Sequence, residues 1–162
     1  MDEPEIERVR IATFTISINF RPRAIEPDVI TRRLGVEPTY KWIAGERTRG
    51  TLGSLLPYPH RESRWSLITS YYDRREDEID PWNEMRDPLG PRLNDRLAEF
   101  LIPFVLERDF VQTVVADSRD PWIGLGFPGQ FHFGFELAPA TLAAIIDFGL
   151  PLGIEIFPNT AS

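Results

Sequence analysis

The fold class is decided by one alternating stretch at residues 13–20, which reads Thr13-Phe14-Thr15-Ile16-Ser17-Ile18-Asn19-Phe20. Apolar and polar side chains alternate along its whole length, and a period of two is typical of a β-strand with one buried and one exposed face. The apolar face of such a strand must be covered by a second layer. We therefore expect a sheet that is covered on one side, and the rest of the chain must supply its other strands and its cover.

A short helix is predicted directly after this strand, at residues 27–34. Pro27 suits the first helical position, and Gly35 suits the left-handed residue that often follows the last helical turn. Acidic side chains lie near the start of this segment and basic ones near its end, as the helix dipole favours. Both ends of the helix are therefore marked in the sequence.

The remaining elements are predicted from the same kinds of signal. An apolar stripe predicts a helix at residues 91–101, which Pro103 should end because proline cannot continue the hydrogen-bond ladder. A second helix that starts on a proline is predicted at residues 139–148. Further strands are expected at residues 39–43, 65–72, 111–116, 131–137 and 152–157. The segments rich in glycine and proline, at residues 45–63 and between residues 116 and 131, are expected to be loops.

The resulting order, β-α-β-β-α-β-β-α-β, is typical of an α+β fold. We expect a single domain over residues 1–162, with its core at about residues 11–157 and a loop insertion at residues 45–63. The predicted sheet is open and mainly antiparallel, with helices on one face. The first six elements match a ferredoxin-like β-α-β-β-α-β core, which the last three extend by a β-α-β unit.

Composition narrows the classes of function. The 162 residues include no cysteine, which excludes disulfides, thiolate metal sites and cysteine nucleophiles. A net charge of -7 argues against nucleic acid and anionic membranes as partners. The first ten residues carry four acidic side chains and no apolar run, and no apolar stretch approaches the roughly 20 residues that cross a bilayer. We therefore expect a soluble cytoplasmic protein, and the sequence leaves its oligomeric state open.

The charge is distributed unevenly along the chain. Between residues 41 and 64, five basic side chains face two acidic ones, a balance of +3, which leaves -10 for the rest of the chain. Aromatic side chains are interleaved with these charges, and arginine beside aromatic rings can bind a planar anion or a carboxylate. The candidate ligand-binding residues are Lys41, Trp42, Arg47, Arg49, Arg61 and Arg64. The alternative is a solvated loop whose arginines pair with carboxylates of the same chain.

A repeated tripeptide suggests a second candidate surface. Asp-Pro-Trp occurs at residues 80–82 and again at residues 120–122. Aspartate and proline favour a turn, and a tryptophan presented on a turn is a common anchor at protein interfaces. Trp82 and Trp122 are therefore candidate partner-binding residues. The alternative is that each indole folds back onto the edge of the sheet.

Signatures of an enzyme or a cofactor site are missing or incomplete. Residues 124–129 match G-x-G-x-x-G, but Pro128 removes an amide and a strand is predicted to follow, so a loop is expected instead of a dinucleotide site. Residues 45–51 resemble a phosphate-binding loop that lacks its lysine. Two histidines are too few to suggest a zinc site. We predict no cofactor, no metal and no catalytic residue, and a pair among the 25 acidic residues is the catalytic alternative left open.

Several short motifs resemble one known family. They are Leu34-Gly35-Val36-Glu37-Pro38-Thr39, Gly45-Glu46, Trp65-Ser66-Leu67, a closing Gly149, and a final Gly153-Ile154-Glu155-Ile156-Phe157. Together they resemble the bacterial family called domain of unknown function 4279, over nearly the whole chain from about residue 11 to residue 157. The resemblance implies a small stand-alone α+β domain and no catalytic residues.

Two functional hypotheses follow from the sequence. The first is a non-enzymatic binding or interaction protein, for example an immunity-type protein whose acidic surface captures a basic protein partner by electrostatic steering. The second is a ligand-sensing domain in which residues 41–64 close over a small anion. The position of the 45–63 loop discriminates between them, because the second hypothesis requires Arg47, Arg61 or Arg64 to line a concave site with a tryptophan.

Overall fold

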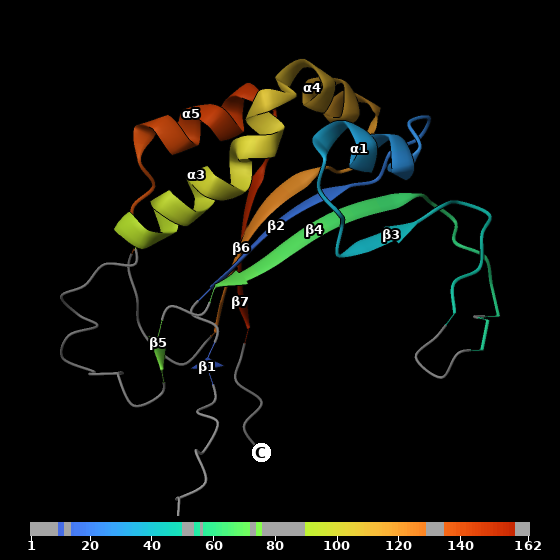
Figure 1. Ribbon diagram of the computed structural model, residues 1–162, viewed down its shortest axis with the longest axis horizontal. Helices are drawn as coiled ribbons and strands as arrows, with labels where there is room; N and C mark the ends of the chain where they lie inside the picture. Colours follow the sequence, from blue (N-terminus) through green and yellow to red (C-terminus); the bar gives the residue numbers. More distant parts are fainter. Residues whose placement is uncertain are drawn as a thin grey trace, which may run out of the picture.

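The computed structural model describes residues 10–11, 14–49, 54–55, 57–71, 74–75, 90–128 and 135–157. In chain order its elements are β1 (Arg10–Ile11), β2 (Phe14–Phe20), α1 (Pro27–Leu34), β3 (Tyr40–Trp42), β4 (Arg64–Tyr71), β5 (Arg74–Arg75), α3 (Gly90–Leu106), α4 (Arg108–Asp117), β6 (Trp122–Pro128), α5 (Pro139–Asp147) and β7 (Leu152–Phe157) (Figure 1). The predicted α+β class is confirmed.

Five of these strands form one sheet in the order β3-β4-β2-β6-β7, with β2 at its centre. β2 pairs antiparallel with β4 and β6, β3 pairs antiparallel with β4, and β6 pairs parallel with β7. β6 and β7 can pair in parallel because α5 lies between them in the chain and returns the chain to the end of the sheet where β6 begins. β1 and β5 form a separate two-stranded pair. The sheet is therefore mixed and mainly antiparallel, while the ferredoxin-like arrangement stays a prediction.

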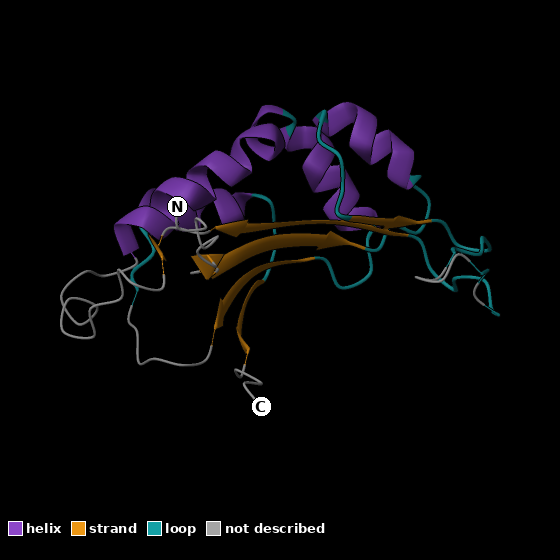
Figure 2. Cartoon of the chain, turned by 60° about the horizontal axis from the view of Figure 1, so that its bottom comes forward, coloured by secondary structure: helices purple, strands orange, loops and turns teal. Residues whose placement is uncertain are grey.

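The four described helices all lie on one face of this sheet, and among the described residues no helix covers the other face (Figure 2). The hydrophobic core fills the space between the two layers. Four side chains of β2 are fully buried in it, namely Phe14, Ile16, Ile18 and Phe20. The apolar side chains of β2 thus lie on the helix-covered face of the sheet, and the polar side chains that alternate with them lie on the helix-free face.

The predicted helix at residues 27–34 is confirmed as α1, and one buried tryptophan fastens it to the sheet. Gly35 has a φ of 66° and donates its N–H to the Thr31 carbonyl at 2.9 Å. The hydroxyl of Thr31 accepts a 3.0 Å hydrogen bond from the indole nitrogen of Trp65 in β4. The Trp65 ring also contacts the rings of Phe20 and Phe104, at centroid distances of 5.8 and 6.3 Å. Trp65 therefore joins α1, the central strands and α3.

The prediction that Pro103 ends the longest helix is wrong. α3 continues through Pro103 to Leu106. A proline inside a helix loses one backbone hydrogen bond and crowds the preceding turn. Phe100 and Phe104, on either side of Pro103, are both buried in the core, and this burial favours the continued helix more than the lost bond disfavours it.

The strand predicted at residues 111–116 is also wrong, because this segment belongs to α4. Val111 and Val114 are its buried residues. They lie three positions apart, which places both on one side of a helix. β-branched residues favour strands only by a weak intrinsic preference, and burial of one helical face overrides it here.

The segment at residues 122–128 was predicted to be a loop and is instead the strand β6. Its apolar side chains, Ile123, Leu125 and Phe127, are fully buried in the core. The strand predicted at residues 131–137 is not found in its described part, because residues 135–138 form no strand, and residues 131–134 lie outside the described residues. Phe135 packs on the core, with its ring 5.1 Å from that of Phe127.

Glycines in β6 make room for two aromatic rings on the helix-free face. A Cβ atom on Gly124 would lie 2.1 Å from the indole of Trp122, and one on Gly126 would lie 2.6 Å from the ring of Phe157. The same indole lies 3.2 Å from the Cβ position of Gly153 in β7. Trp122 therefore lies across two neighbouring strands, which is possible because both carry glycine beneath it.

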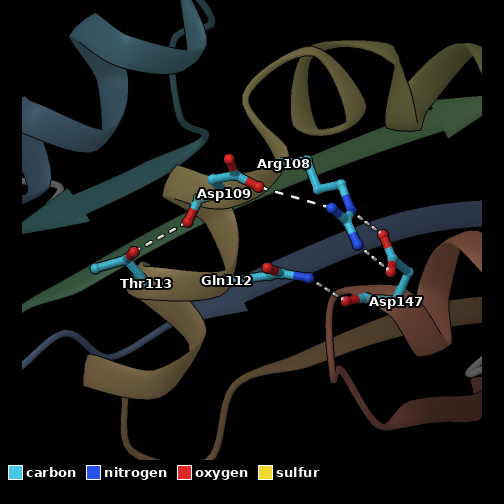
Figure 3. Close-up of polar contacts among 5 residues, drawn as sticks. All are labelled: Arg108, Asp109, Gln112, Thr113 and Asp147. Carbon is cyan, nitrogen blue, oxygen red and sulfur yellow. Dashed lines mark hydrogen bonds and ion pairs between the residues drawn. The ribbon is translucent and has the colours of Figure 1, made fainter.

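A polar cluster joins α4 to α5 on the outer side of the helix layer (Figure 3). Two nitrogens of the Arg108 guanidinium, Nε and Nη2, donate to the carboxylate of Asp147. Gln112, one turn further along α4, donates to the Asp147 carbonyl at 2.7 Å. The Arg108 hydrogen bond and charge hold the pKa of Asp147 below its ordinary value. The end of α5 is therefore fixed against the start of α4.

Candidate functional site

One end of the sheet carries two adjoining cavities, where β2 and β3 end and where β4 and β6 begin. The first has a volume of about 300 Å³ and is lined by Arg21, Pro22, Arg23, Ala44, Arg61, Glu62, Ser63 and Arg119. The second has a volume of about 360 Å³ and is lined by Arg21, Trp42, Arg61, Glu62, Ser63 and Arg64. Because the two share four lining residues, we treat them as one site and call it the arginine recess.

The arginine recess carries a surplus of positive charge. Its lining includes five arginines, and Glu62 is the one carboxylate among the lining residues. Glu62 accepts a 2.5 Å hydrogen bond from Arg119 and lies 4.0 Å from the nearest nitrogen of Arg21. Within the described residues, the guanidiniums of Arg23 and Arg61 form no ion pair or side-chain hydrogen bond. One carboxylate is therefore set against five guanidiniums.

Two segments that are far apart in the sequence are joined to form one wall of the recess. The carboxylate of Asp117, at the end of α4, accepts hydrogen bonds of 2.9–3.2 Å from the backbone amides of Arg23, Ala24 and Ile25. Arg119 donates its backbone N–H to the Arg21 carbonyl at 2.9 Å. Burial raises the pKa of Asp117, but the three amide hydrogen bonds lower it by more, so this carboxyl stays ionised to lower pH than usual. Asp117 thus brings three of the arginines to one place.

The end of the 45–63 loop contributes Arg61, Glu62 and Ser63 to the lining, and the described parts of this loop are joined by hydrogen bonds. Gly45 donates its N–H to the His60 carbonyl at 2.8 Å, and His60 donates its own to the Glu46 carbonyl at 2.9 Å. The imidazole of His60 stacks on the indole of Trp42, with 5.0 Å between centroids and 14° between planes. Its Nε2 lies 3.0 Å from the Thr48 hydroxyl. The loop ends are therefore ordered against the last residue of β3.

Among the arginines of the recess, Arg64 has the most contacts with other described side chains. Its guanidinium lies 5.2 Å from the centroid of the Trp42 ring and donates to the Ser66 hydroxyl at 2.8 Å and to the Asn19 amide oxygen at 3.0 Å. Both hydrogen-bond acceptors are neutral. Burial lowers the pKa of Arg64, and the charge of Arg21 lowers it further, although a guanidinium remains protonated at neutral pH. Its positive charge is therefore not neutralised by these contacts.

The structure brings together three of the six candidate ligand-binding residues, namely Trp42, Arg61 and Arg64. Lys41 lies on the opposite, helix-covered face of β3, where its ammonium binds Asp28 of α1 at 2.6 Å and its pKa is raised by that hydrogen bond. Arg47 and Arg49 line neither cavity of the arginine recess. Of the predicted site residues, the recess therefore contains the last residue of β3, the first residue of β4, and Arg61 shortly before β4.

Arg21, Arg23 and Arg119 were not among the sequence candidates, although all three line the recess. The available signal was the pair Arg21 and Arg23, which directly follows the predicted strand and flanks Pro22. Basic residues at a strand end lie at one edge of the sheet, where loops from other strands also converge. That Arg119 joins them depends on Asp117 and could not be predicted from neighbouring residues.

The two candidate partner-binding tryptophans differ in outcome. Trp82 lies outside the described residues. Trp122 lies across Gly124 and Gly153 on the helix-free face and lines neither cavity of the arginine recess. Its position corresponds to the alternative in which the indole folds back onto the sheet.

The chemistry available to the recess is binding of an oxyanion. Guanidinium groups offer paired N–H donors that match the oxygens of a carboxylate or phosphate. In the part of the chain that the structure describes, no three His, Asp or Glu side chains lie together in a way that could hold a metal ion. No helix among the described residues is long and apolar enough to cross a membrane.

Comparison with known proteins gives one match. The model of a family described as "Domain of unknown function (DUF4279)" matches residues 10–158, which is nearly the whole chain. No curated protein and no solved structure is significantly similar to this chain.

Proposed function

Because the chain belongs to the family described as a domain of unknown function (DUF4279), we propose its function from the chemistry of its own site: it is a binding domain that holds a small oxyanion in the arginine recess. The observation that carries this proposal is the surplus of charge, five arginines against one carboxylate. A small oxyanion offers the acceptors and the negative charge that these guanidiniums lack.

The alternative, in which the arginines are neutralised by carboxylates of the same chain, applies to one part of this site. The charge of Arg23 interacts with the carboxylate of Asp117, whereas Arg64 donates to two neutral groups and Arg61 has no ionic partner among the described residues. Glu62 accepts a hydrogen bond from Arg119 and lies 4.0 Å from Arg21. The positive charges of Arg61 and Arg64 therefore have no neutralising partner among the described residues, and these two arginines support the proposal.

The hypothesis of an immunity-type protein with a basic partner stays a prediction. It rested on the acidic remainder of the chain and on Trp82 and Trp122. Trp122 packs against Gly124 and Gly153, which supports a structural role for its indole more than a role as a partner-binding anchor.

Replacing Arg61 with alanine is expected to weaken the binding of an oxyanion by a factor of about 10 to 150, because a hydrogen bond to a charged group contributes about 1.5–3 kcal/mol. Arg23→Ala should have a similar effect. Isothermal titration calorimetry with inorganic phosphate, sulfate and citrate measures both. Arg47→Ala is the matched control, since Arg47 is an exposed arginine of the same loop that lines neither cavity. Equal losses in all three variants, or no binding to the unmodified protein, would refute the proposed function.

Replacing Glu62 with glutamine is expected to tighten binding of the same anions about three- to tenfold. Arg119 donates a hydrogen bond to Glu62 and so is less available to a ligand. A negative charge about 4 Å from a bound anion also repels that anion, by about 1 kcal/mol in water and by more in the recess. Glu46→Gln, in the same loop but outside the lining, should leave affinity unchanged. Weaker binding by Glu62→Gln would show instead that Glu62 positions Arg119 for the ligand.

A further inference from the structure

The arginine recess has two parts of different character. Among the described residues, the first cavity has no aromatic side chain in its lining, which consists of four arginines with Pro22, Ala44, Glu62 and Ser63. The second cavity shares Arg21, Arg61, Glu62 and Ser63 with the first and adds the indole of Trp42 and the guanidinium of Arg64. A ligand that fills both parts therefore meets four arginines in the first part and an aromatic ring beside arginines in the second.

The size of the recess is greater than an isolated inorganic anion requires. Each part alone, at about 300 and 360 Å³, falls at the lower end of the range that accommodates an organic ligand, about 300–1,000 Å³. A phosphate or sulfate ion would fill only a fraction of the first part and would leave the Trp42 side open. The volume points to an anion that is attached to a larger group.

Trp42 is held rigidly, as a wall for a flat group must be. His60 stacks on its ring at 5.0 Å, and Arg64 lies over the ring at 5.2 Å. Arg64 is in turn held by Asn19 and Ser66. Because Trp42 also lines the second cavity, the part of its indole that His60 and Arg64 leave uncovered can contact a planar ring without the ordering of a mobile side chain.

We propose, on the basis of the proposed anion-binding function, that the ligand is a phosphate monoester carrying a planar ring. Its phosphoryl group lies among Arg21, Arg23 and Arg119, and its ring lies against Trp42. A phosphoryl group carries a charge of about -1.5 to -2 at pH 7 and three acceptor oxygens. It can therefore pair with several guanidiniums at once, whereas a carboxylate has one charge and two oxygens. Glu62 and Ser63 line both cavities and therefore lie between the two ends.

Calorimetric titration of the whole chain with phenyl phosphate, cyclohexyl phosphate and inorganic phosphate tests this inference. Phenyl phosphate is expected to bind about three- to tenfold more tightly than inorganic phosphate, as one aromatic contact would provide, and more tightly than cyclohexyl phosphate. Trp42→Leu should remove the preference for phenyl phosphate. Tyr58→Leu is the control, because Tyr58 is an exposed aromatic residue of the same loop that lines neither cavity.

The outcomes separate this inference from the proposed function. If inorganic phosphate binds and the phenyl group adds no affinity, or adds only what the cyclohexyl group adds, the planar-ring inference is overturned while anion binding stands. If none of the three compounds binds, both fail. If Trp42→Leu also weakens inorganic phosphate, Trp42→Phe decides: retention of the phenyl preference in this variant supports the aromatic contact, and its loss contradicts it.

Discussion

Replacing Trp65 with alanine is expected to lower the free energy of unfolding by about 3–5 kcal/mol. Among the described residues Trp65 is the largest fully buried side chain, and its ring contacts Phe20 and Phe104. Its removal leaves a cavity between the sheet and the helices, and the Thr31 hydroxyl loses its indole partner. A domain of this size is stable by about 5–15 kcal/mol, so the variant should lose a large part of its stability.

Urea denaturation followed by circular dichroism measures this effect. Two further variants separate the contribution of the aromatic ring from that of the indole hydrogen bond. Trp65→Phe keeps an aromatic ring but not the indole N–H, and Thr31→Val removes the acceptor while keeping the shape. Each should cost less than Trp65→Ala, because neither leaves a cavity of the same size. A loss below about 1 kcal/mol for Trp65→Ala would mean that Trp65 does not join the two layers as the structure shows.

Replacing Asp117 with alanine is expected to cost about 2 kcal/mol and to weaken anion binding as well. The loss of stability follows because three backbone amides lose a charged acceptor. The loss of binding follows because these contacts hold Arg21 and Arg23 beside Arg119. Glu107→Ala is a matched control: this carboxylate pairs with Arg33 on the surface and is remote from the recess lining, so it should affect binding little.

The same carboxylate predicts a dependence of stability on pH. The folded-state pKa of Asp117 lies below its ordinary value of 3.8. Its contribution is therefore fully present above the unfolded-state pKa and is lost as pH falls through the lower folded-state pKa. Unfolding free energies measured from pH 7 to pH 3 should fall more steeply below about pH 4 in the unmodified protein than in Asp117→Asn. Parallel curves would contradict this role of Asp117.

The sequence predicted the elements whose signals are local. β2 is marked by strict alternation, and α1 is marked by Pro27 and Gly35 at its ends. α4 was missed because its valines were weighed by strand propensity, although Val111 and Val114 have helical spacing. β6 was missed because glycine was taken as a loop residue, whereas Gly124 and Gly126 have a packing role beneath Trp122 and Phe157.

The sequence predicted those residues of the candidate site that lie close together along the chain. Arg61, Arg64 and Trp42 could be grouped because they lie within one basic, aromatic segment. Arg21 and Arg119 are brought together by the backbone contact between them, by the Asp117 hydrogen bonds and by Glu62, which lies beside both. No local pattern encodes such a meeting, because it depends on where β2 and α4 end once the whole sheet has formed.

The central position of β2 also has a consequence for the time course of folding. β2 is synthesised early, but it pairs on one side with β4, where Ile18 faces Leu67, and on the other with β6, where Ile18 faces Ile123. At about 5–20 residues per second, roughly 5–20 s pass between synthesis of Ile18 and synthesis of Ile123. The central strand of the sheet therefore stays without its second neighbour for this time during synthesis, and non-local pairing of this kind gives slow folding once the chain is complete.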